Sequence, residues 1–182
     1  MKPRYLAIVL LGLVPSLHAE QPFPSAVKPT INVSPGKLTT ASLPEGVRKA
    51  LAAEEVFVED GKTPGQLWGK VIDLNGDGAP EYLVNDPASY TGGPMTYILT
   101  PRRLPLKAKG DSSYRLIGVI QGIDHLAARK NGFYQIVATA RAGGATYERR
   151  LFAYRLTEYV ATRAAEYEFR GDDEIYVKEV AP

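Results

Sequence analysis

The sequence predicts a mainly β (α+β) protein, with an antiparallel sheet or small sandwich and one N-terminal helix. Three observations lead to this prediction. Short apolar runs, some of them alternating, fill the chain after about residue 53, and turn signals containing Gly or Pro separate them. One earlier segment has the capping and spacing of a helix. The length of the chain, 182 residues, suits a single domain.

Residues 1–19 have the pattern of a cleaved secretory signal. Lys2 and Arg4 precede an apolar run that ends at Val14, and Ala19 offers a small-residue cleavage site. The run is too short for a membrane anchor, so we expect a periplasmic or secreted protein with no membrane insertion after cleavage. Because the chain has no cysteine, disulfides and a lipid-modified N-terminal cysteine are both excluded.

The charge of the mature chain is balanced. The full sequence has 22 Lys and Arg and 20 Asp and Glu, and removal of Lys2 and Arg4 with the signal leaves 20 of each sign. A neutral exported protein has little electrostatic reason to bind nucleic acid or an anionic membrane surface. We therefore expect no nucleic-acid partner, and a monomer.

Residues 20–41 are expected to form a flexible Pro-rich linker, since four prolines are scattered among Ser, Thr and Gly. The globular domain then fills residues 42–182. A helix is predicted to open it, from Ser42 to about Ala53. Ser42 can cap this helix, Pro44 fits its first turn and Glu45 completes a capping box. Its apolar stripe comprises Leu43, Val47, Ala50 and Leu51.

Strands are predicted after the helix, at residues 56–58, 66–72, 81–84, 96–99, 114–120, 133–140, 147–156 and 175–180. Alternating apolar residues between 134 and 140, and again between 152 and 156, indicate strands with one buried face. Dipeptides such as Asn131-Gly132 and Gly143-Gly144 mark the turns. The segment 123–129 is ambiguous between a short helix and a strand.

The segment 73–81 combines acidic residues and glycines between two of these strands. Its oxygen-bearing residues fall at alternate positions, with Gly76 and Gly78 supplying backbone freedom for a tight turn. An all-oxygen set of this kind suits a hard cation, and calcium is the predicted cofactor. The predicted ligands are the side chains of Asp73, Asn75, Asp77 and Glu81 and the carbonyl of Ala79.

This loop resembles the calcium hairpin loops of FG-GAP and integrin-type β-propeller repeats. The resemblance covers about 14 residues. More widely, the chain resembles small exported bacterial proteins of uncharacterised function that carry a single loop of this kind. The pattern is not that of an EF-hand, because position 12 is Val84 where a bidentate Glu is required. The alternative is a plain hairpin turn with solvated carboxylates.

No catalytic set is evident, so we expect a protein that is not an enzyme. A serine hydrolase would need His125, the one histidine left after signal removal, with an acid such as the neighbouring Asp124. No Gly-x-Ser-x-Gly elbow accompanies them, and both residues are expected at a solvated bend.

The function predicted from the sequence is a calcium-binding accessory or protein-binding module of the cell envelope, whose partner is an envelope protein or a glycan. Alternatives are a periplasmic antagonist of a lytic enzyme or toxin, and an envelope hydrolase. The expected binding surface combines the calcium loop with two segments that follow it. Its candidate residues are Tyr90, Gly92, Gly93, Arg102 and Arg103.

The charged residues near the C-terminus have two interpretations. Glu166, Glu168 and residues 172–174 make that part of the chain acidic, whereas residues 102–109 are basic. The two regions are either complementary faces within one molecule, or the basic segment is a docking surface for an acidic partner.

Overall fold

The computed structural model of the chain describes residues 23, 29–54, 57, 65–86, 88, 93–102 and 113–182. The expected signal peptide and most of the basic segment lie outside these residues. Within the described part of the chain, no helix is long and apolar enough to cross a membrane.

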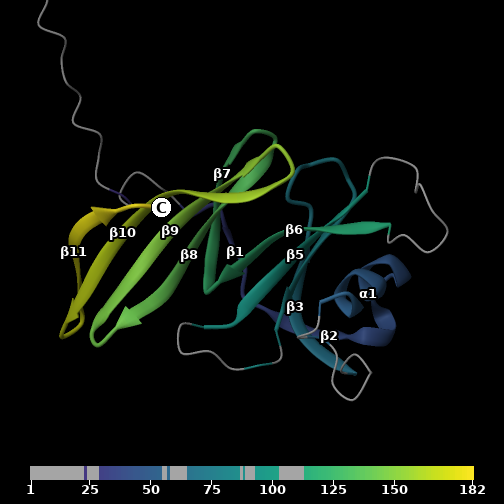
Figure 1. Cartoon of the computed structure of the whole chain (residues 1–182), viewed down its shortest axis with the longest axis horizontal. Coiled ribbons are helices and arrows are strands. Elements are labelled where there is room, and N and C mark those ends of the chain that lie inside the picture. Colours follow the sequence, from purple (N-terminus) through teal and green to yellow (C-terminus); the bar gives the residue numbers. More distant parts are fainter. Residues whose placement is uncertain are drawn as a thin grey trace, which may run out of the picture.

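The described residues form two antiparallel sheets, which lie next to each other in Figure 1. The prediction of a mainly β protein is therefore confirmed. The five-stranded sheet has the order β2-β3-β4-β5-β6. Its strands are β2 (Gly36–Thr39), β3 (Gln66–Ile72), β4 (Glu81–Asn85), β5 (Met95–Pro101) and β6 (Tyr114–Gln121).

The six-stranded sheet has the order β1-β7-β8-β9-β10-β11. Its strands are β1 (Ile31–Asn32), β7 (Ile123–Lys130), β8 (Phe133–Gly143), β9 (Thr146–Arg155), β10 (Glu158–Arg170) and β11 (Asp173–Val180). Apart from β1, this sheet is a meander in which each strand pairs with the next along the chain, because short turns at 131–132, 144–145, 156–157 and 171–172 join them.

Each sheet buries both of its faces at least in part. Between the sheets lies a cluster to which Leu83 and Ile98 contribute from one sheet, and Leu126 and Ile136 from the other. The opposite face of the five-stranded sheet is covered by α1 (Glu45–Ala52), which lies at the right in Figure 1. Neighbouring residues of a strand point to opposite faces, which explains why β4 and β5 are buried along almost their whole length.

The face of the six-stranded sheet that is turned away from the five-stranded sheet is called the outer face below. Its buried cluster includes Val137, Tyr147, Leu151 and Tyr167, and Phe23 from the N-terminal part of the chain also belongs to it. The ring of Phe23 is fully buried, and the Tyr167 hydroxyl donates a hydrogen bond to the Phe23 carbonyl.

The described residues of the segment predicted to be a linker, Phe23 and residues 29–41, belong to the fold. Ile31 and Asn32 pair with β7 of one sheet, whereas residues 36–39 pair with β3 of the other. Between them, Val33 is 5% exposed and packs in the cluster between the sheets. Edge strands tolerate the interrupting prolines, so a Pro-rich composition is compatible with pairing here.

Four strands were not predicted as strands from the sequence. β1 and β2 lie in the predicted linker, β7 is the segment that was ambiguous between helix and strand, and β10 fills thirteen residues for which no strand was predicted. β10 is rich in Ala, Glu and Arg, which favour helices locally. Pairing with β9 on one side and β11 on the other satisfies its backbone groups, and this tertiary context overrides the local preference.

Candidate functional site

The acidic loop connects β3 to β4 at one end of the five-stranded sheet. Gly76 and Gly78 have φ angles of 76° and 83°, as the turn requires. Leu74 is fully buried in the cluster between the sheets, so the loop is fixed to the core at that point. The local turn chemistry therefore positions the side chains that were predicted to bind calcium.

The side chains of the loop accept hydrogen bonds from its backbone. The Asp73 carboxylate accepts from the N–H groups of residues 75, 76 and 78. The Asn75 and Asp77 side chains each accept, at 2.8 Å, from the N–H two residues later. Burial alone would raise the pKa of Asp73, but the three backbone hydrogen bonds outweigh burial and lower this pKa.

Glu81 is the buried centre of the loop. Its side chain is 0% exposed, and its carboxylate accepts three hydrogen bonds, at 2.7 Å from the Leu74 N–H, 3.0 Å from Asn75 Nδ2 and 2.8 Å from Thr100 Oγ1. Burial raises the pKa of Glu81, and the nearby carboxylates of Asp77 and Asp73 add to this effect, whereas the hydrogen bonds oppose it.

The loop also contacts the six-stranded sheet. The Tyr134 N–H donates to the Leu74 carbonyl at 2.9 Å. The guanidinium of Arg129 lies 4.5 Å from the centre of the Tyr134 ring and against the backbone of Gly76, where an added Cβ would come within 2.2 Å of its nitrogen. One positive charge from β7 thus lies beside the three carboxylates.

The chemistry of the loop fits calcium, although its described conformation is not a coordination shell. It offers three carboxylates and one amide oxygen. Asp73 Oδ1 and Glu81 Oε1 each already accept two hydrogen bonds, so these two oxygens would have to release donors to bind an ion. Within the described residues, no group of three or more His, Cys, Asp and Glu side chains is arranged to hold a metal ion. Calcium binding by the predicted set stays a prediction, and it requires these side chains to turn toward a common point.

The two described residues of the predicted binding surface are not brought together. Gly93 precedes β5 and Arg102 follows it, so they lie beyond opposite ends of a seven-residue strand that spans roughly 20 Å. The acidic loop is at the Arg102 end, since Glu81 is hydrogen-bonded to Thr100. Tyr90, Gly92 and Arg103 lie outside the described residues.

A pocket of about 680 Å³ opens on the outer face of the six-stranded sheet. β7, β8, β9 and β10 all contribute to it, and it was not predicted from the sequence. Strand alternation places Thr139, Tyr147 and Arg149 on one face, but β10, which supplies Phe169, was not recognised as a strand. The lining includes Asp124, His125, Thr139, Arg141, Tyr147 and Phe169.

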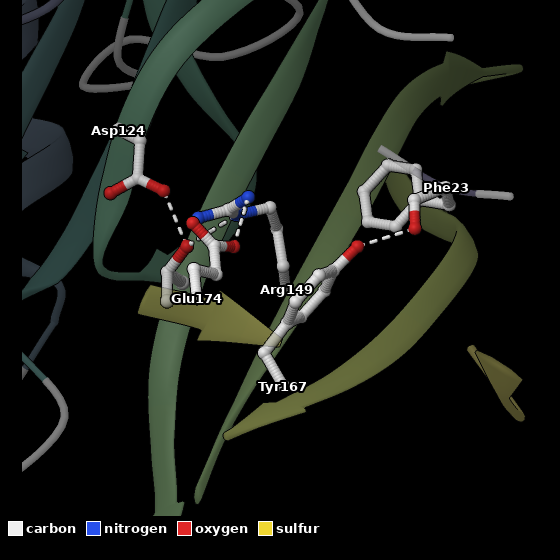
Figure 2. Close-up of polar contacts among 6 residues, drawn as sticks. Phe23, Asp124, Arg149, Tyr167 and Glu174 are labelled. Atoms are coloured by element: carbon white, nitrogen blue, oxygen red, sulfur yellow. Dashed lines mark hydrogen bonds and ion pairs between the residues drawn. The ribbon is translucent and has the colours of Figure 1, made fainter. Parts of the chain in front are cut away.

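A row of polar contacts crosses the pocket (Figure 2). Thr139 Oγ1 donates to the Asp124 carboxylate and accepts from Arg149 Nε at 3.2 Å. Arg149 Nη1 lies 2.7 Å from Glu174 Oε1, and its guanidinium packs 5.1 Å from the centre of the Tyr167 ring. These contacts join residues of five strands and hold the side chains of the pocket in place.

Two buried polar atoms beside this row have no hydrogen-bond partner among the described residues. They are His125 Nε2 and the hydroxyl of Tyr147, a residue that is only 5% exposed. Burial and the nearby Glu174 carboxylate raise the pKa of Tyr147 to about 12, although no hydrogen bond of normal geometry joins Tyr147 to that carboxylate. A buried polar group without a partner costs about 1–3 kcal/mol. Both atoms have almost no accessible surface, so a ligand in the pocket would reach them only if neighbouring side chains moved.

The expectation of a solvated bend at Asp124 and His125 is wrong. Both residues belong to β7, where a bulge interrupts the pairing with β8, and Nε2 of His125 is buried. Burial lowers the pKa of His125; Asp124 opposes this effect and Arg149 adds to it. The Asp124 carboxylate accepts a hydrogen bond from Thr139.

The acidic residues near the C-terminus form ion pairs within their own sheet. Glu166 pairs with Lys178, Glu168 with Arg170 and Glu174 with Arg149. These neighbours neutralise three of the five acidic residues of this region.

The sequence matches no protein-family model and no curated protein, and the fold matches no solved structure. The described part of the chain is therefore classified from its own structure, as a two-sheet antiparallel β protein. It has an acidic loop between the sheets and a pocket on the outer face of one of them.

Proposed function

We propose that the protein is an exported, non-enzymatic binding domain of the cell envelope, and that the outer-face pocket receives its ligand. The observation that carries this proposal is the pocket itself, where the exposed side chains of Arg141 and Phe169 lie with the Asp124 carboxylate. A pocket of about 680 Å³ lies in the ordinary size range of ligand sites. Export, to the periplasm or beyond it, rests on the signal pattern of residues 1–19.

The proposal is tested by affinity capture from an envelope extract. The wild type is compared with a double variant, Arg141→Gln with Phe169→Ala, which changes two exposed side chains of the pocket. The matched control is Arg155→Gln with Trp68→Ala, two exposed residues elsewhere. We expect the wild type and the control to retain the same protein or glycan and the pocket variant to lose it. Equal retention by all three, or none, would overturn the proposal.

Calcium is proposed as a structural ion of the acidic loop, held by Asp73, Asn75, Asp77 and Glu81 with the carbonyl of Ala79. In support, the Asp77 carboxylate acts to raise the pKa of both Asp73 and Glu81, and a cation would relieve this repulsion. With a Kd of roughly 10⁻⁴ M in about 1 mM calcium, the ion would stabilise the fold by about 1.4 kcal/mol.

Thermal melts with calcium and with chelator test this part of the proposal. The wild type should melt a few degrees higher in calcium, and Asp77→Ala should lose the difference. Equal melting temperatures in both conditions would leave the loop as a plain hairpin turn.

The same samples separate the alternative functions. An antagonist would inhibit a lytic enzyme or toxin that it captures, whereas an accessory module would inhibit nothing. A hydrolase would lose its activity, but not its fold, in His125→Ala.

A further inference from the structure

The charges at the outer-face pocket balance. Asp124 and Arg141 line it, and Arg149 is paired with Glu174 at 2.7 Å. A ligand with a negative charge would approach the Asp124 carboxylate, and a cation would approach the Arg141 guanidinium. His125 adds no charge near neutral pH, because burial lowers its pKa. The site is therefore suited to a ligand without net charge.

The wall of the pocket offers an exposed aromatic ring. Phe169 is 54% exposed, and its ring is stacked on that of Tyr147 with 4.7 Å between the ring centres. The stacking fixes the orientation of the Phe169 ring while much of its surface stays open to the pocket. A flat apolar group of the ligand can pack on this surface.

The exposed polar side chains of the pocket suit a partner that both donates and accepts hydrogen bonds. The Asp124 carboxylate accepts only, and the Arg141 guanidinium donates only. Hydroxyl groups can pair with every member of this set, directly or through a water molecule.

From these observations we infer that the outer-face pocket binds a sugar ring of an uncharged glycan. A pyranose has apolar C–H faces, which pack on the Phe169 ring, and hydroxyl edges, which reach Asp124 and Arg141. This inference rests on the proposed binding function and names the ligand of the same pocket.

The test measures binding to an array of uncharged oligosaccharides built from glucose, galactose, mannose and N-acetylhexosamines in α and β linkages. Calorimetry then gives Kd for the best binder. Phe169→Ala and Arg141→Gln should each weaken this binding about tenfold or more. The matched controls, Trp68→Ala and Arg155→Gln, should leave Kd within about twofold. Unchanged melting temperatures would show that all four variants fold.

The inference is overturned if no uncharged oligosaccharide binds, or if binding is equal in the pocket and control variants. It is also overturned if benzoate or putrescine, used as an anionic and a cationic probe, binds more tightly than every sugar. Failure on the array together with pocket-dependent capture of a protein from the extract would leave the binding function standing and remove the sugar. Failure in both experiments would remove both proposals.

Discussion

Glu81 has an unusual environment for a carboxylate, because it is fully buried and has three hydrogen-bond donors but no ion pair among the described residues. Its donors come from the loop and from β5, so the side chain ties the start of β4 to both. Burial raises its pKa, which means that ionisation of Glu81 opposes folding in the absence of a cation.

Glu81→Gln should therefore change how stability depends on pH. A group with a raised pKa in the folded state stabilises the fold below its unfolded pKa, and this stability is lost as pH rises through the folded value. In chelator, the melting temperature of the wild type should fall relative to that of the variant as pH rises from about 4 to 7. Added calcium should reduce this pH-dependent fall in the melting temperature, and it should do so only in the wild type. A constant difference between the two proteins across this range would contradict the role given to Glu81.

Gly69 lies where β3 and β4 approach most closely. An added Cβ at this position would be 2.1 Å from the Leu83 carbonyl oxygen and 2.9 Å from Leu38 Cδ1. The first of these atoms belongs to the backbone of the neighbouring strand, so it cannot move without disturbing the pairing of β3 with β4.

Gly69→Ala should destabilise the protein by about 1–3 kcal/mol, as measured by urea unfolding. Gly65→Ala is the control, because an added Cβ there would meet nothing within 4 Å. Equal unfolding midpoints for the two variants would mean that the sheet adjusts to the methyl group without cost.

Among the elements, the β7–β8 hairpin contacts the acidic loop through Arg129 and Tyr134. Its two-residue turn has positive φ at Asn131 (56°) and Gly132 (84°), which matches the twist of the paired strands. Asn131 Nδ2 also donates to the Tyr154 carbonyl at 2.9 Å, so the turn is fixed to β9 as well.

Asn131→Val should cost about 2 kcal/mol of unfolding free energy, since a β-branched residue is strained at positive φ and the hydrogen bond to Tyr154 is lost. Asn131→Gly loses the hydrogen bond but permits the turn, and should cost about 1 kcal/mol or less. Chemical unfolding of both variants measures the difference. A valine variant as stable as the glycine variant would show that the left-handed conformation is not required.

At the scale of the whole molecule, the described residues before the helix contribute to both sheets. Phe23 is buried on the outer face, Val33 packs between the sheets, and β1 and β2 extend one sheet each. Arg163 lies over the Phe23 ring, with 5.6 Å between the guanidinium carbon and the ring centre. The globular unit thus extends before residue 42, where the sequence placed its start.

A chain that begins at Ser42 should consequently be less stable than one that begins at Glu20. Loss of a buried Phe side chain costs about 3–5 kcal/mol, which lowers Tm by roughly 6–20 °C in a domain of this size. Calorimetry of the two chains provides the measurement, and Phe23→Ala in the longer chain isolates the contribution of the ring. Equal Tm values for all three would favour a free linker.

What the sequence by itself determined about this protein follows from local chemistry. The bounds of β3, the turn at Asn131-Gly132 and the positive φ angles of Gly76 and Gly78 could all be predicted. Each depends on residues that are neighbours in the chain, through side-chain alternation or through the conformational freedom of glycine.

Tertiary structure alone decided which distant residues meet. Thr100 donates to Glu81 from another strand, and β10 is a strand because it lies between β9 and β11, against the helical preference of its Ala and Glu residues. The outer-face pocket joins Asp124 to Phe169 across four strands. Such contacts follow from strand order and register, which depend on the packing of whole sheets and leave no local signal in the chain.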